Sequence, residues 1–263
     1  MQIFRFEWKR SQKYILIWAA TLAVCIFSMT PVYYGMIETV ETLPVEFTQG
    51  GFFETVGISL ELLMEPLGMY SFLTGFFMVA GGIFGMHLGL SLHTEECTGN
   101  TAEYLYTKPC GRKQIYMGKL LCALAGICVT GIFYLATSFL TMTLFRFGFP
   151  IGEFFLVAGS FILISLFFAL LGLMVGIFHP NNRSPLLTAG LVVFVEYCIT
   201  SFSRTVNIRA IGFLSPFSIF SPAEIHNAGT YSWDYMLWYL LLLFGFALLA
   251  YWKILKRDIA LAV

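Results

Sequence analysis

Long apolar segments separated by short polar ones make up most of this sequence. A helix needs about 20 consecutive apolar residues to cross the hydrocarbon core of a bilayer. Six segments reach or approach that length, at about residues 14–34, 72–92, 117–145, 154–178, 186–202 and 235–252. Their apolar runs are continuous rather than alternating, which disfavours a β-barrel. The pattern therefore predicts an all-α integral membrane protein, with a single transmembrane domain over residues 1–263.

Two further segments are too short to span a bilayer. Residues 1–13 are rich in lysine and arginine, and Ile3, Phe4 and Trp8 can share one helix face. This combination predicts a short N-terminal interfacial helix that leads into the first span. Residues 208–220 are apolar but interrupted by glycine and proline, which predicts re-entrant or interfacial helices before the sixth span.

The segment between the first two spans, residues 35–70, carries six glutamates and no lysine or arginine. Its apolar residues follow a helical stripe, with glutamates on the other side. The stripe consists of Phe53, Val56, Leu60, Leu63, Met64 and Leu67. Two interpretations remain open: an amphipathic helix lying on the membrane or tucked into it, and a solvated acidic loop.

Glycine recurs at helical spacing in the second span. The positions are Gly75, Gly81, Gly82, Gly85 and Gly89. Small residues in this arrangement let two helix backbones approach closely in lipid. We therefore expect the second span to pack tightly against another helix.

Composition supports a membrane protein. The chain is 58% hydrophobic and only 11% charged, with a mean hydropathy of +0.80. A formal net charge of zero argues against nucleic-acid binding. The six cysteines lie in apolar runs or in one polar segment, which is typical of reduced thiols. Cys97 and Cys110 have only His93 nearby as a further ligand, so we expect no metal site.

The distribution of charge predicts the topology. Six spans place both termini on one side, and lysine and arginine mark the cytoplasmic side. With a cytoplasmic N-terminus, twelve of the fifteen lysines and arginines fall inside, and only Arg146, Arg204 and Arg209 fall outside. The protein is therefore expected in the plasma membrane of a prokaryote, with both termini in the cytoplasm and residues 35–70 outside.

A polar segment at residues 95–115, between the second and third spans, predicts a short cytoplasmic helix. Thr101 is a good N-cap, and Glu103 follows in the first turn, where the helix dipole favours a carboxylate. Pro109 ends the helix after about two turns. Tyr104 and Leu105 give it apolar surface, so the helix has the character of a docking element for another protein.

Motifs for catalysis or nucleotide binding are missing from the sequence. There is no phosphate-binding loop of the Gly-x-x-x-x-Gly-Lys-Ser/Thr type, no His-Glu-x-x-His and no Gly-x-Ser-x-Gly. The pair Glu95 and Glu96 fits the Glu-Glu-x-x-x-Arg pattern of intramembrane proteases only in part, because Asn100 stands in place of arginine. We therefore expect no catalytic residue, and no ATP bound by this chain.

Glu196 is the one carboxylate inside a predicted span, about 16 Å of helix beyond Pro185 and thus near the bilayer midplane. Ionisable groups at such depth are candidates for a translocation path. A protonated glutamate that hydrogen-bonds a neighbouring helix explains the residue equally well. Both interpretations remain open.

The polar segment resembles the cytoplasmic loop of the ABC-2 type permease family. That loop has acidic residues, then Thr-x-Glu-x-Leu-x-Thr-x-Pro-x-x-Arg, then a lysine in the next span. The corresponding residues here are Glu95, Glu96, Thr101, Glu103, Leu105, Thr107, Pro109, Arg112 and Lys119. The segment 215–217 before the last span and the C-terminal residues 251–259 also look like that family.

The resemblance implies a type V exporter fold with six spans, an N-terminal interfacial helix and re-entrant helices before the last span. It also implies that the short helix is a coupling helix, which docks on a separate ABC ATPase. The ATPase-coupling residues would be those quoted above, together with Tyr104. Two permease chains, alike or different, and two ATPases would form an exporter of antimicrobial peptides, other drugs or lipids. ATP and Mg²⁺ would be bound by the partner.

Two other functions compete with this one. A secondary transporter or channel would use Glu196, although ion-coupled transporters usually carry several intramembrane polar sites. A membrane enzyme would need an assembled catalytic set, which the sequence lacks. Dependence on a soluble ATPase separates the first function from both alternatives.

Overall fold

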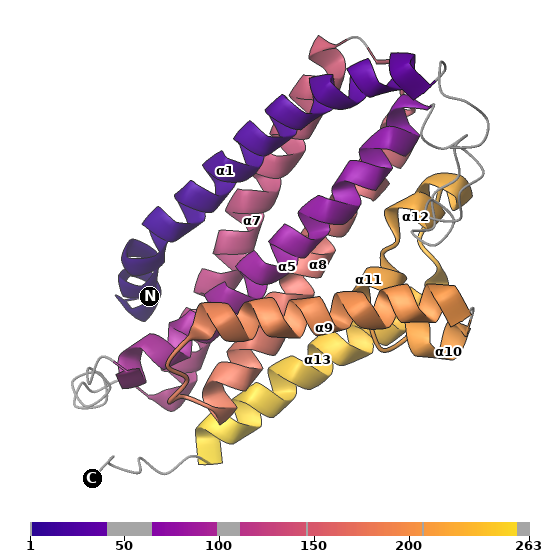
Figure 1. Cartoon of the computed structure of the whole chain (residues 1–263). Coiled ribbons are helices and arrows are strands. Elements are labelled where there is room, and N and C mark those ends of the chain that lie inside the picture. The colour runs from indigo at the N-terminus through magenta and orange to yellow at the C-terminus, as the bar shows by residue number, and fades with distance from the viewer. Residues whose placement is uncertain (1, 41–64, 99–110, 146, 207, 257–263) are drawn as a thin grey trace.

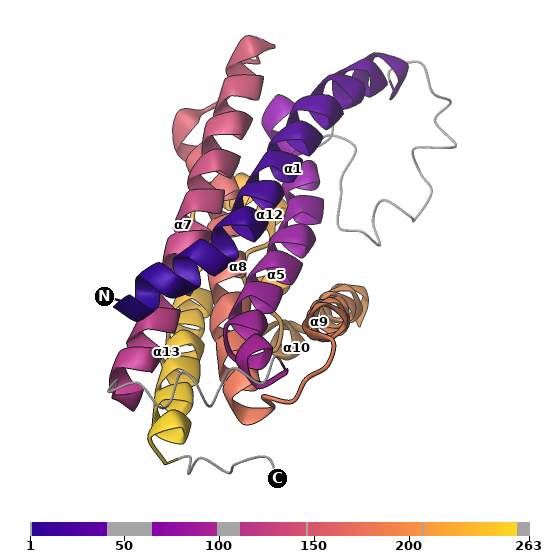
Figure 2. The ribbon, with the colours of Figure 1, turned by 90° about the vertical axis from the view of Figure 1, so that its left-hand side faces the viewer.

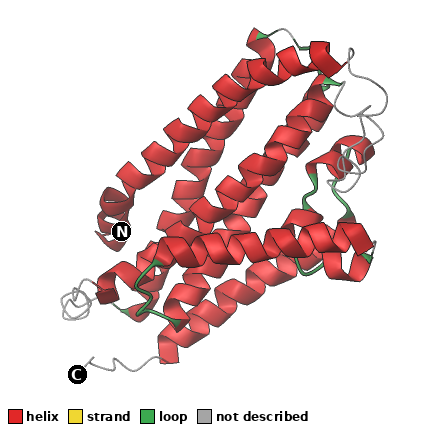
Figure 3. Cartoon of the chain, viewed as in Figure 1, coloured by secondary structure: helices red, strands yellow, loops and turns green. Residues whose placement is uncertain are grey.

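The computed structural model describes residues 2–40, 65–98, 111–145, 147–206 and 208–256. These residues form helices joined by loops, with no strand among them (Figure 3). The long helices are α1 (Gln2–Val40), α5 (Pro66–Thr98), α7 (Arg112–Leu144), α8 (Ile151–Phe178), α9 (Pro185–Val206) and α13 (Trp233–Lys256). Three short helices, α10 (Arg209–Gly212), α11 (Pro216–Ile219) and α12 (Pro222–Ala228), lie between α9 and α13.

All six long helices are long and apolar enough to cross a membrane, which confirms the predicted number of spans. The start of α1 and the end of α13 lie at the same end of the bundle (Figure 1). Large apolar side chains on the outer helices, among them Phe194 on α9 and Phe244 on α13, are exposed. Exposed apolar surface of this kind suits contact with lipid chains.

The predicted N-terminal helix is not separate from the first span. Residues 2–13 form the first turns of α1, which continues without interruption to Val40. No glycine or proline occurs before Pro31, so nothing in the local sequence favours a break. At 39 residues, α1 is about 58 Å long, well beyond the thickness of a hydrocarbon core.

The closest helix pair is α5 with α8, and glycine makes it possible. A side chain at Gly85 or Gly89 would collide with the α8 backbone at Ser165 and Ala169, and one at Gly172 would collide with the α5 backbone at Met86. Gly81 and Gly82 leave room for phenylalanine rings of α8, whereas Gly75 faces open space. The expected close packing is therefore confirmed for four of the five glycines.

Around this pair the other helices form two groups. α1 packs on α7 along one side, while α9 and α13 lie on the other (Figures 1 and 2). Figure 2 shows α9 nearly end-on beside α5, so the two helices cross steeply. The interior is filled by aromatic side chains: Tyr134 of α7 stacks on Phe161 of α8 with 4.1 Å between ring centroids, and Phe77 of α5 packs edge-on against Tyr134.

The expected interruption before the last span is present as short helices. Proline begins both α11 and α12, where its missing N–H costs no intrahelical bond, and Gly229 ends α12 with a φ of 64°. Hydroxyl contacts hold this region on α9, with 2.8 Å between Thr200 Oγ1 and Ser215 Oγ. Re-entry of these helices into the membrane stays a prediction.

Candidate functional site

The end of α5 and the start of α7 flank residues 99–110. The predicted docking helix, with Thr101, Glu103, Tyr104, Leu105, Thr107 and Pro109, lies outside the described residues and stays a prediction. The amphipathic stripe predicted from Phe53 to Leu67 lies outside them except for Leu67, which is buried in the first turn of α5. Of the candidate coupling residues, Glu95 and Glu96 lie near the end of α5, and Arg112 is the first residue of α7.

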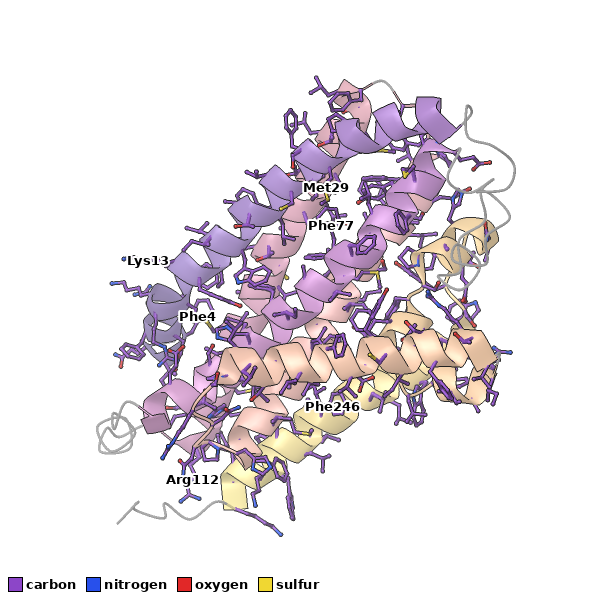
Figure 4. All side chains as sticks on the ribbon, in the orientation of Figure 1. Phe4, Lys13, Met29, Phe77, Arg112 and Phe246 are labelled. Atoms are coloured by element: carbon purple, nitrogen blue, oxygen red, sulfur yellow. The ribbon has the colours of Figure 1, made fainter. Side chains whose placement is uncertain are left out.

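The first turns of α7 are fixed to the end of α13. Gly111 precedes the helix in an extended conformation, and its carbonyl accepts the N–H of Gln114 at 2.8 Å. The Arg112 guanidinium donates to the backbone carbonyl of Leu255 at 3.1 Å, at the end of the bundle where Figure 4 labels it. One turn later, the Tyr116 hydroxyl donates to the carbonyl of Ala247 at 2.9 Å.

A buried ion pair joins α7 to α1. Lys119 Nζ lies 3.2 Å from Glu7 Oε1, and neither side chain is exposed. Lys119 also donates to the carbonyl of Leu92, in the last third of α5. The ammonium group of Lys119 therefore joins its own helix, α7, to α1 and α5, near the helix ends that flank residues 99–110.

The ion pair continues outward through Arg10. Its Nη2 lies 2.8 Å from Glu7 Oε2, and its Nε lies 3.3 Å from Glu95 Oε2. The exposed fraction rises from 0% at Glu7 through 26% at Arg10 to 50% at Glu95. We call Glu7, Arg10, Glu95 and Lys119 the charged cluster. It runs from the closed interior to the surface where α5 ends.

Electrostatics explains why the charged cluster contains two cations and two carboxylates. Taking one charge into a low-dielectric interior costs several kcal/mol, and a close partner of opposite sign offsets that cost. Glu7 contacts both cations, Arg10 on its own helix and Lys119 on α7. Arg10 in turn contacts Glu95 on α5. The cluster therefore ties the helix ends on both sides of residues 99–110 to α1.

Sequence reasoning found part of this cluster and missed the rest. The sequence marks Lys119 and Glu95 as candidate coupling residues, whereas Glu7 and Arg10 fall in the segment predicted to be an interfacial helix. The available signal was that Glu7 is the only acidic residue among the first 13 and lies three positions before Arg10, on the same helix face. Nothing in the sequence near Glu7 indicates that Lys119, on α7, is its second partner.

Glu196 lies apart from the charged cluster, on α9. Its side chain is half-buried beside Ser215, and its backbone carbonyl accepts from the Ser215 hydroxyl at 2.8 Å. It forms no ion pair with any residue that the structure describes. Within the described ranges, no group of three metal-binding side chains is present.

The geometry is that of a bundle of helices long and apolar enough to span a membrane, with ion pairs near the two helix ends that flank residues 99–110. A family model for ABC-2 family transporter proteins matches residues 1–259. No curated protein matches the chain in sequence. Because the family match covers almost the whole chain, the protein belongs to the ABC-2 transporter family and is a membrane permease subunit that associates with an ABC ATPase.

Proposed function

We propose that this permease exports a hydrophobic or amphipathic cargo, such as an antimicrobial peptide, another drug or a lipid-like molecule. The separate ATPase would bind ATP and Mg²⁺, and this chain would convert closure of the ATPase into helix movement. The observation that carries the proposal is the charged cluster, since it joins three helices beside the loop expected to dock.

Transmission would proceed through two sets of contacts. A displacement of residues 102–108 would move the end of α5 and the start of α7, between which they lie. The Lys119–Glu7 ion pair would carry the movement into α1. The contacts of Arg112 and Tyr116 with backbone carbonyls of α13 would carry it into the last span. No covalent chemistry on this chain is needed.

The orientation follows from where the charges lie on the bundle. The cations at the end that carries the charged cluster are Arg5, Lys9, Arg10, Lys13, Arg112, Lys113, Lys119, Arg183, Lys253 and Lys256. At the opposite end, the structure describes Arg204 and Arg209. By the positive-inside rule, this distribution supports the proposal that both termini and the charged cluster lie in the cytoplasm of a prokaryotic cell. A second permease chain, identical or different, and two ATPase copies would complete the exporter.

Export is tested in two steps. The tagged permease, purified under mild conditions, should carry a soluble ATPase, and the permease alone should show no ATP hydrolysis. Inside-out vesicles with both subunits should accumulate a fluorescent amphipathic peptide only when ATP is supplied. Accumulation driven by a proton or sodium gradient without ATP would contradict the proposal and favour the secondary transporter.

A further inference from the structure

A pocket of about 70 Å³ opens between α5, α9, α11 and α12, near the end of the bundle opposite the charged cluster. Its walls include four aromatic side chains and one cationic side chain. The residues that matter here are Phe72, Gly75, Phe76, Tyr197, Arg204 and Phe217. The volume exceeds what one water molecule needs and can take a short stretch of a hydrocarbon chain.

Arg204 gives the pocket an uncompensated positive charge. Its guanidinium donates to the Ser221 hydroxyl at 3.0 Å, and no carboxylate of the described residues lies within ion-pair distance. Arg209, on the same end of the bundle, differs. Its guanidinium pairs with Asp234 at 3.1 Å and lies over the Tyr235 ring.

Away from Arg204, the pocket is lined mainly by apolar side chains, and it opens to the surface of the bundle at Phe76. Phe217 closes its inner wall and is almost fully buried, whereas Phe76 is 54% exposed. Gly75 has no heavy atom within 4 Å of the position where a side chain would begin. The glycines at 81, 82, 85 and 89 on the same helix are instead filled in by side chains or backbone of α8. The space beside Gly75 is part of the pocket.

We propose that this pocket binds an anionic membrane lipid, with its phosphate on the Arg204 guanidinium and part of a hydrocarbon chain beside Gly75. A guanidinium presents several donors in a plane and matches phosphate oxygens well, which suits Arg204 to this ligand. The aromatic walls suit a hydrocarbon chain, and the exposed side at Phe76 lets it enter from the bilayer. The proposal concerns lipid binding by the permease alone and does not depend on export.

The test uses the purified, full-length permease in detergent without the ATPase. Native mass spectrometry follows the binding of phosphatidylglycerol, which is anionic, and phosphatidylcholine, which is zwitterionic. We expect Arg204→Gln to weaken phosphatidylglycerol binding about tenfold, because it removes the charge-assisted contact to phosphate. Arg209→Gln is the matched control, since Arg209 is already paired, and should leave binding unchanged.

A second variant tests the apolar part of the pocket. Gly75→Leu should fill the space, weaken phosphatidylglycerol binding by a similar factor and not lower the unfolding temperature, because the added Cβ meets no heavy atom within 4 Å and leucine favours the helix more than glycine does. Equal effects of the two arginine variants would overturn the proposal, as would equal binding of both lipids. Inorganic phosphate that displaces the lipid at equal concentration would show recognition of charge alone and would also contradict it. Because the ATPase is absent, any of these failures leaves the export proposal intact.

Discussion

Lys119 and Glu7 face each other in the closed interior of the bundle, with 3.2 Å between Nζ and Oε1 and no exposed surface on either side chain. The pair joins α7 to α1 near the start of α7, which follows the segment expected to receive the ATPase. Breaking a buried pair from one side leaves an uncompensated charge, which typically costs about 3–5 kcal/mol. This cost makes the pair accessible to a double-mutant cycle.

We expect Glu7→Gln to destabilise the permease more than Lys119→Met does. Loss of Glu7 removes a carboxylate that contacts both Lys119 and Arg10, whereas loss of Lys119 leaves Glu7 paired with Arg10. The double variant should be less destabilised than the sum of the two changes, by about 1–3 kcal/mol. Thermal unfolding of the purified variants in detergent measures all three. Strict additivity would show that the two groups do not stabilise each other.

The packing of α5 on α8 predicts a difference between two glycines. Gly89→Ala should lower the free energy of unfolding by about 1–3 kcal/mol, because the new methyl group meets the α8 backbone at Ala169 and the helices must separate. Gly75→Ala has the same intrinsic effect on helix propensity but meets no atom, and is the control. Comparison of unfolding temperatures decides the matter; equal losses would mean that close approach is not what Gly89 provides.

Glu196→Gln is expected to preserve both folding and ATP-driven transport. The carboxylate has no ion pair among the described residues, and an amide is nearly the same size. Unfolding temperature and ATP-dependent cargo accumulation are the measurements. A properly folded variant that no longer transports would place Glu196 in the translocation path.

His226 links the start of α5 and the start of α8 through α12. Its Nε2 lies 3.2 Å from Glu65 Oε2, and its Nδ1 lies 3.4 Å from Glu153 Oε2. Only the protonated ring can donate to both carboxylates. We expect His226→Gln to cost about 0.5–1 kcal/mol in the free energy of unfolding, because an amide cannot reach both carboxylates. Glu224→Gln, an exposed change on the same helix, is the control. Equal unfolding temperatures of the two variants would contradict a role for His226 in joining these helices.

The number of spans was predictable because a bilayer imposes one length on every apolar helix that crosses it. The glycines of α5 also predicted a close helix–helix contact, although only the structure identifies α8 as the partner. The predicted boundary at residue 13, between an interfacial helix and the first span, was wrong. The cationic residues before it favour an interface, but no glycine or proline interrupts the helix there.

The charged cluster was only partly predictable. Glu95 and Lys119 stood out because they belong to a recognisable cytoplasmic segment. Glu7 did not, because its partner lies on a helix far along the chain and sequence periodicity carries no information about such pairs. The same limit applies to Arg204. The sequence indicates only that it is a cation on the outer side, and the pocket beside it is formed by residues far apart in the chain.

The central claim is that residues 102–108 connect the ATPase to this permease. Tyr104→Ala with Leu105→Ala removes the apolar surface expected to dock, and truncating such an anchor typically costs about 2 kcal/mol or more of binding free energy. Glu103→Lys should weaken docking through charge mismatch with less loss of packing. Exposed Lys113→Ala, on the first turn of α7, serves as a nearby control.

The most direct measurement is affinity of the ATPase for the permease in detergent, together with cargo-stimulated ATP hydrolysis by the complex. The account predicts that the Tyr104→Ala, Leu105→Ala variant inserts and unfolds like the wild type but binds the ATPase at least about thirtyfold more weakly, or hydrolyses ATP without response to cargo. Wild-type affinity and wild-type cargo stimulation in that variant would contradict it.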